Sequence, residues 1–218
     1  MKVPEENVFP KPEGKSFEET AALPVTFLTA WHMLVTRAKV KPTDVVLVWA
    51  GGSGVGNASI QIAKLFNATV IATAGTDEKV DRLLKMGVDR AINHRKGDVL
   101  EEVMNFTGGK GVDVVVEHVG AATWETSMKS LKKGGILVTC GATTGKDVGF
   151  DIRHLYSRQL SVLGSLLGTK GEFLEVLKLF SRGLLNPVIH KVYEFERVAE
   201  AQREMEESRH FGKIVLRL

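Results

Sequence analysis

Short apolar runs alternate with segments of helical spacing along most of this chain. Six runs predict strands: Val45–Trp49, Thr69–Ala74, Asp89–Asn93, Val112–His118, Ile136–Cys140 and Leu160–Gly164. The segments between them predict helices: Val55–Phe66, Asp77–Met86, Asp98–Phe106, Thr123–Leu131 and Ile152–Tyr156. The first run is apolar on both faces, which is typical of a central strand covered by helices on both sides. The pattern therefore predicts an α/β fold with a doubly wound, six-stranded parallel sheet.

The ends of the chain follow a different pattern. The first twenty residues are rich in proline and charge and predict an extended connector, closed by a capping box at Ser16–Glu19. A further helix is expected after Pro24. A helix with Phe173, Leu174, Leu177 and Phe180 is expected after the sixth strand. The tail predicts a strand at Val188–Phe195, a charged helix at Val198–Glu207 and a last strand at Phe211–Leu218. These pieces are too few for a second core.

A glycine cluster ends the first predicted strand and opens the next helix. Gly51-Gly52-Ser53-Gly54-Val55-Gly56 follows the fingerprint G-x-G-x-x-G of dinucleotide-binding folds, with Ser53 in place of the middle glycine. Glycines at such a turn let a ligand approach the backbone, and the helix directs free N–H groups at it. The pattern favours a Rossmann-type site for a pyrophosphate; a tight turn that binds nothing is the alternative.

Composition excludes several other classes of protein. The chain has 218 residues, a net charge of +3 and a single cysteine, Cys140. Such a small, dispersed charge does not favour nucleic acid or an anionic membrane as a partner. One cysteine excludes internal disulfides, which fits a reducing, cytoplasmic setting. Cys140 is interpreted as a core residue, the six histidines lack metal-ligand spacing, and no G-x-S-x-G hydrolase motif is present.

The end of the second strand bears on the choice of cofactor. NAD-specific sites place an acid there, roughly 20 residues after the glycine loop, to bind ribose hydroxyls. This chain has Ala74, Gly75 and Thr76 instead, and Lys79 follows in the first turn of the next helix. A lysine at that place suits a 2′-phosphate, so NADP(H) is favoured over NAD(H). The alternative interpretation makes Lys79 a solvated surface residue.

Six motifs in order resemble the medium-chain dehydrogenase/reductase superfamily, in its zinc-type alcohol dehydrogenase and quinone oxidoreductase branch. They are Asn7–Gly14, Thr26–Trp31, Ala50–Gly56, Ala72–Thr76, Thr107–Val115 and Phe211–Val215. The resemblance implies an NAD(P)-dependent oxidoreductase whose cofactor domain is inserted into a GroES-like catalytic domain. It also implies that this chain is the C-terminal portion and lacks most of the N-terminal catalytic domain. Zinc would then be bound only if that domain supplied its ligands.

The resemblance also implies the roles of individual residues. Thr29 is expected near the cofactor, and Gly51, Ser53, Gly54, Val55 and Gly56 at the pyrophosphate. The adenosine-phosphate pocket is expected to involve Gly75, Thr76, Lys79, His94 and Arg209. The strand ends Val119, Gly120, Gly141 and Ala142 are expected to line the path from adenine ribose to nicotinamide. No catalytic residue can be assigned.

Three domain segments and two classes of function follow. Residues 1–22 are expected to form a connector, 23–185 the cofactor domain and 186–218 a return into the catalytic domain. The chain is either the cofactor part of an enzyme that transfers hydride to or from an alcohol or carbonyl, a quinone or an enone, or an inactive NADP(H)-binding module. In relatives the last strand of the sheet pairs with its two-fold mate, so a homodimer through Leu160–Gly164 is expected.

Overall fold

The structure is a computed structural model that describes residues 2–218. Its larger sheet contains β1 (Val45–Val48), β2 (Thr69–Ala74), β3 (Arg90–Asn93), β4 (Val112–Glu117), β5 (Leu131–Thr139) and β6 (Ser161–Gly164). All neighbours are parallel, and the order is β3-β2-β1-β4-β5-β6. The order reverses between β1 and β4, which is the point where ligands bind in open sheets of this kind. The predicted fold class is confirmed.

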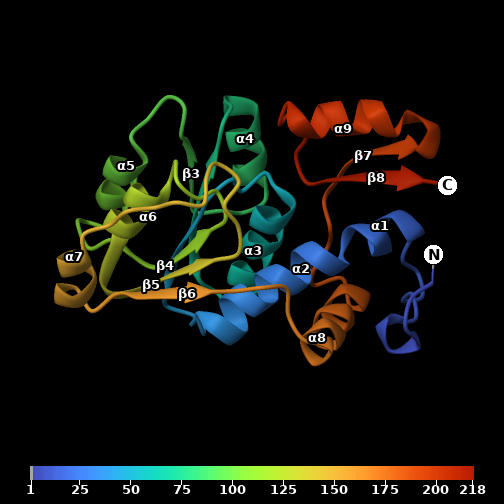
Figure 1. Ribbon diagram of the computed structural model, residues 1–218, viewed down its shortest axis with the longest axis horizontal. Helices are drawn as coiled ribbons and strands as arrows, with labels where there is room; N and C mark the ends of the chain where they lie inside the picture. Colours follow the sequence, from blue (N-terminus) through green and yellow to red (C-terminus); the bar gives the residue numbers. More distant parts are fainter. Residues whose placement is uncertain (1) are drawn as a thin grey trace.

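Helices cover both faces of this sheet (Figure 1). One face carries α2 (Pro24–Trp31), α3 (Gly54–Leu65), α4 (Asp77–Lys85) and α8 (Lys170–Ser181), and the other carries α5 (Val99–Phe106) and α6 (Trp124–Ser130). Val46 and Val48 pack into the first core, whereas Leu47 and Trp49 pack into the second. This two-sided burial explains why β1 is apolar at successive positions. The short helix α7 (Ile152–Ser157) precedes β6.

Two elements differ from the sequence prediction. β5 begins at Leu131, five residues before the predicted start at Ile136, because Leu131 pairs with Val112 across an irregular register. Two lysines and two glycines separate Leu131 from Ile136, and they gave no apolar signal. The helix after Pro24 changes to a π-helical segment, η2 (His32–Arg37), in which the Ala38 N–H donates to the Met33 carbonyl.

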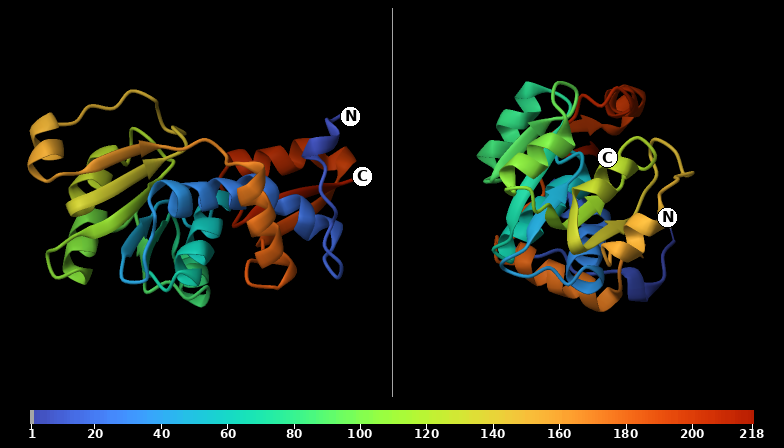
Figure 2. Two further views of the ribbon diagram at one scale, coloured as in Figure 1. Left: turned by 90° about the horizontal axis from the view of Figure 1, so that it is seen from below. Right: turned by 90° about the vertical axis from the view of Figure 1, so that its left-hand side faces the viewer.

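The chain ends in a small C-terminal lobe made of β7 (Ile189–Glu194), η3 (Phe195–Arg197), α9 (Val198–Glu206) and β8 (Lys213–Arg217). β7 and β8 pair in parallel, as a strand–helix–strand unit. α1 (Phe17–Ala22) lies beside this sheet and begins with the expected capping box at Ser16, after a first turn η1 (Glu5–Asn7). Figure 2 shows the lobe at one end of the molecule, next to both termini. The predicted domain limits stay a prediction.

Among residues 2–218, no helix is both long and apolar enough to cross a membrane.

Candidate functional site

The loop between β1 and α3 lies at the point where the strand order reverses. Its Gly51 N–H donates to the Thr73 carbonyl at 2.8 Å, and its Ser53 N–H donates to Ala50 O at 2.8 Å. Ser53 is the N-cap of α3, and its hydroxyl oxygen accepts from the Gly56 N–H at 3.0 Å. The next two amides, of Gly54 and Val55, have no acceptor within the helix. They and the positive end of the helix dipole form a site suited to an anion.

Packing requires glycine at two positions of this loop. A Cβ on Gly56 would lie 2.3 Å from the Ala50 carbonyl oxygen, so α3 can approach β1 only without a side chain here. A Cβ on Gly54 would lie 2.7 Å from Thr26 Cγ2 and 2.9 Å from Lys213 Cδ. The third glycine of the fingerprint therefore has the packing role that this motif assigns to it.

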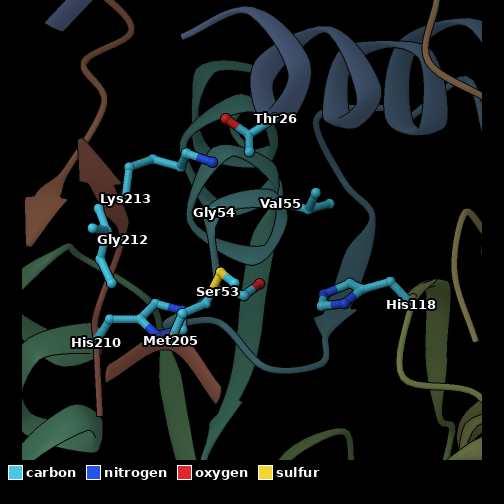
Figure 3. A pocket seen from close by; sticks show the side chains of 10 residues that line it. Thr26, Ser53, Gly54, Val55, His118, Met205, His210, Gly212 and Lys213 are labelled. Carbon is cyan, nitrogen blue, oxygen red and sulfur yellow. The ribbon is translucent and has the colours of Figure 1, made fainter. Parts of the chain in front are cut away.

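A cleft of about 240 Å³ opens in front of these amides (Figure 3). Its walls come from segments that are distant in sequence: Thr26 of α2, Ser53–Val55, His118 after β4, and Met205, His210 and residues 212–214 of the C-terminal lobe. Figure 3 shows Lys213 and Thr26 beside Gly54, and His210 beside Ser53. The structure therefore places three of the predicted residues, Ser53, Gly54 and Val55, at one cleft, and Thr26, His210 and Lys213 line it with them. Their contact with a pyrophosphate stays a prediction.

A second cavity of about 460 Å³ lies on the other side of the loop, by the carboxyl ends of β1, β3 and β4. Trp49, Ala50, His94, Val119 and residues 97–99 line it, together with Ala122 and three threonines. Of the predicted residues, it contains His94 and Val119. Gly120, Gly141 and Ala142 do not line it. A Cβ on Gly120 would be 2.9 Å from Ala142 Cα, and one on Gly141 would be 2.9 Å from His118 O, so these turns pack closely on each other.

Lys79 lies in a group of positively charged and titratable side chains at the end of β2. Thr76 caps α4 by accepting from the Lys79 N–H at 3.3 Å, and Lys79 Nζ donates to the Ser208 carbonyl at 2.5 Å. Burial, Arg95 and Arg82 lower the pKa of Lys79. Burial, Arg95 and Lys79 likewise lower the pKa of His94. Lys79, Arg82 and Arg95 place positive charge at this end of β2, and Glu78 opposes their effect on the pKa of Lys79.

Two predicted residues lie elsewhere. Thr29 is buried on α2 and does not line either cavity, whereas Thr26, one turn earlier, reaches the cleft. Arg209 forms an ion pair of 2.6 Å with Glu207. His210 beside it lines the cleft, and its Nδ1 is buried with no hydrogen-bond partner in the described part of the chain. Burial, Lys79 and His190 lower the pKa of His210.

The sequence analysis missed Glu117, the last residue of β4, which is fully buried. One carboxylate oxygen accepts from the N–H groups of Val119 and Gly120 at 2.6 and 3.0 Å. The other accepts from the hydroxyls of Thr123 at 2.8 Å and Ser127 at 2.6 Å. Ser127 in turn accepts from Trp49 Nε1 at 2.7 Å, so Glu117 fixes the wall of the second cavity. The sequence sign of this buried carboxylate is a glutamate that directly follows the apolar run Val114-Val115-Val116.

His118 and Cys140 lie close to this buried carboxylate. Burial lowers the pKa of His118, although Glu117 opposes this, and the ring hydrogen-bonds through Nε2 to the Trp49 carbonyl at 3.0 Å. Burial and the Glu117 charge raise the pKa of the Cys140 thiol to about 11. The thiol is therefore a poor nucleophile at neutral pH, which agrees with its interpretation as a packing residue.

Comparison with known proteins places this geometry in a family. The model of the zinc-binding dehydrogenase family matches residues 54–182, which run from the start of α3 to just past α8. The chain belongs to this family. The family lies within the medium-chain dehydrogenase/reductase superfamily, so the resemblance of the motifs is confirmed.

Relatives from the family align with nearly all of this chain. Quinone oxidoreductase of Homo sapiens is 30% identical over an alignment that covers 97% of this chain and 66% of that protein. Crotonyl-CoA reductase of Streptomyces avermitilis is 30% identical over 95% of this chain and 51% of its own length. The chain thus spans about half to two thirds of the length of these relatives.

Solved structures of the family superpose closely on this one. The crystal structure of an NAD-dependent alcohol dehydrogenase matches with a TM-score of 0.94 and 46% identity, over 99% of this chain and 63% of that one. A 2-octenoyl-CoA carboxylase reductase in complex with NADP matches with a TM-score of 0.91 and 30% identity, over 98% of this chain and 52% of that one. This chain corresponds to the cofactor-binding part of such oxidoreductases.

The family description names zinc, which proteins bind through clusters of Cys, His and acidic side chains. Across residues 2–218, no three His, Cys, Asp or Glu side chains lie close enough together to hold a metal ion. The residues present therefore do not fit a zinc site.

Proposed function

We propose that this chain binds NADP(H) and is the cofactor half of an oxidoreductase that transfers hydride between nicotinamide and an alcohol or carbonyl, a quinone or an enone. The observation that carries the proposal is the free N-terminus of α3, which opens on a cleft at the reversal of strand order. Two solved relatives of 25% and 30% identity are described as complexes with NADP, whereas the one of 46% identity is described as NAD-dependent. The choice of NADP(H) therefore depends on Lys79 and on the lack of an acid at the end of β2.

The two cavities would bind different parts of the dinucleotide. The amides of Gly54 and Val55 would donate to the diphosphate, and Lys213 would add a positive charge beside them. The larger cavity, between Trp49, His94 and Val119, would take the adenosine. Lys79 and His94 would then face the 2′ position of its ribose. When bound, the nicotinamide supplies the hydride, and this chain orients the ring and excludes water from one side.

The runner-up function is a binding module that performs no chemistry. The catalytic residues of the proposed enzyme are not assigned to this chain, so binding without turnover is a real alternative. The names of the relatives, quinone oxidoreductase and crotonyl-CoA reductase, favour the oxidoreductase.

Fluorescence titration with NADPH tests the binding that both functions share. We expect NADPH to bind and to raise the melting temperature of the protein. Consumption of NADPH with quinones, aldehydes or enones then selects the enzyme, whereas binding without consumption selects the module. Titration without any binding signal would contradict both.

We also propose that two copies associate through β6. This strand ends the sheet, pairs only with β5 within the described residues, and exposes 37% of Val162. An uncovered parallel edge with an apolar side chain favours pairing with an identical strand. Light scattering is expected to give the mass of a dimer, and Val162→Lys to shift it to that of a monomer. A wild-type monomer would contradict the proposal.

A further inference from the structure

Met205 differs from the other methionines because its side chain is open to solvent at the candidate cofactor cleft. It is 53% exposed, whereas Met33 and Met128 are buried at 0% and 3%. Met86 is half-buried, and its sulfur accepts a hydrogen bond from Asn57 Nδ2 at 3.2 Å. Of the methionines that the structure describes, Met205 therefore offers its thioether most freely to a dissolved reactant.

The end of α9 fixes the position of Met205. The Ser208 N–H donates to the Met205 carbonyl at 3.0 Å, which closes the last turn of the helix. The preceding residue, Glu204, holds α9 on β7, because its carboxylate accepts from His190 Nε2 at 2.7 Å and from the Tyr193 hydroxyl. The Met205 side chain is thereby kept at the cleft, into which Figure 3 shows it directed.

The cleft that Met205 borders contains several hydrogen-bond donors. The amides of Gly54 and Val55, at the start of α3, have no acceptor within the helix. His210 Nδ1 is buried without a hydrogen-bond partner in residues 2–218, so it can donate when it carries the proton. The thioether of Met205 is only a weak acceptor and leaves these donors available. A strong acceptor on the same side chain would compete for them.

We propose that Met205 is an oxidation site through which hydrogen peroxide weakens cofactor binding. The sulfur attacks one peroxide oxygen and gives up two electrons, so that a sulfur–oxygen bond forms and the oxygen–oxygen bond breaks. The other oxygen leaves as water with both peroxide protons, and methionine sulfoxide remains. The sulfoxide oxygen then accepts from the donors to which the diphosphate would bind. This effect on binding rests on the proposed function, whereas the site of oxidation does not.

The test treats the whole chain with hydrogen peroxide and follows two readouts. Mass spectrometry of its peptides is expected to find added oxygen on Met205 before any other methionine within residues 2–218. Fluorescence titration is expected to show NADPH and NADH weakened by the same factor of about tenfold, because both contain the diphosphate. Reduction of the sulfoxide by methionine sulfoxide reductases should restore both affinities.

Two variants separate the sulfur from the rest of the side chain. Met205→Leu has no sulfur, so its affinities after peroxide should equal its own affinities before peroxide. Met205→Gln carries a strong acceptor without any oxidation, and it should bind both cofactors more weakly than Met205→Leu. Met104→Leu replaces a half-buried methionine of α5 that lines neither cavity, and this matched control should keep the full response of the wild type.

The outcomes separate this inference from the proposed function. Oxidised Met205 with unchanged affinities would overturn the inference, and so would an equal loss of affinity in Met205→Leu after peroxide. Oxidation of Cys140, or of another methionine within residues 2–218, ahead of Met205 would overturn it as well. A wild type that binds neither dinucleotide before peroxide would instead overturn the proposed function, and the effect of oxidation on binding with it.

Discussion

The two ends of the candidate site are built in different ways. At the loop between β1 and α3, the groups proposed to face the ligand are backbone amides, and packing against Ala50 and Thr26 leaves no room for side chains at Gly56 and Gly54. At the end of β2, the groups proposed to face the ligand are the side chains of Lys79 and His94. The first end suits the diphosphate that both dinucleotides share, and the second suits the one group in which they differ. Affinity and selectivity are therefore expected to respond to different substitutions.

The largest effect is expected at the loop. Gly56→Val places a side chain where even a Cβ would meet the Ala50 carbonyl at 2.3 Å, so α3 must move away from β1. We expect a loss of about 3 kcal/mol of stability and no binding of either cofactor. Thermal melts and calorimetry measure both. Gly149→Ala, in an open part of the chain, is the control and should change neither.

A smaller and selective effect is expected at the other end. Lys79→Ala should weaken NADPH by about 10- to 100-fold, because one charge-assisted contact is worth about 1.5–3 kcal/mol. NADH should lose far less, as fluorescence titration can show. Equal losses for the two cofactors would mean that Lys79 does not contact the 2′-phosphate. Lys85→Ala on the same helix is the matched control.

A modest effect that does not distinguish the cofactors is expected from Ser53→Ala. The variant loses the N-cap of α3, which costs about 1 kcal/mol, and weakens NADPH and NADH by the same few-fold factor. Ser53→Gly restores the glycine of the fingerprint and should cost less, since glycine is the better cap of the two. Selective loss of NADPH in either variant would contradict the division between the two ends.

The last expectation concerns Cys140, which lines neither cavity, and the pH dependence of its thiol. Because the pKa of the thiol is raised to about 11, the thiolate is scarce at pH 8, and its reaction with a thiol reagent should be about 100-fold slower than that of a free cysteine. The rate should rise about tenfold per pH unit and level off near pH 11. Fast reaction at pH 8 in the folded protein would show that the thiol is accessible and its pKa ordinary.

The fold could be predicted because its signals are local. Each central strand is apolar on both faces, and the capping residues Ser16, Ser53 and Thr76 mark where helices begin. The early start of β5 was missed because strand pairing, not local sequence, extends it to Leu131.

The site could be predicted only where one segment contains it. The residues 51–56 follow a known spacing, whereas Thr26, His210 and Lys213 reach the same cleft from opposite ends of the chain. A charged residue in a turn, such as Arg95, resembles any solvated arginine until the fold places it over Gly75. The same reason explains why no local pattern in the sequence pointed to His210, which lines the cleft.

The Gly212 N–H donates to the Gly52 carbonyl at 2.8 Å, and Phe211 packs so closely on Gly52 that a Cβ there would meet it at 2.9 Å. This hydrogen bond and this packing hold the β7–β8 sheet against the loop between β1 and α3. The position of the Gly54 and Val55 amides therefore depends on contacts with the C-terminal lobe as well as on β1. The C-terminal lobe is consequently part of the framework that holds the proposed cofactor site.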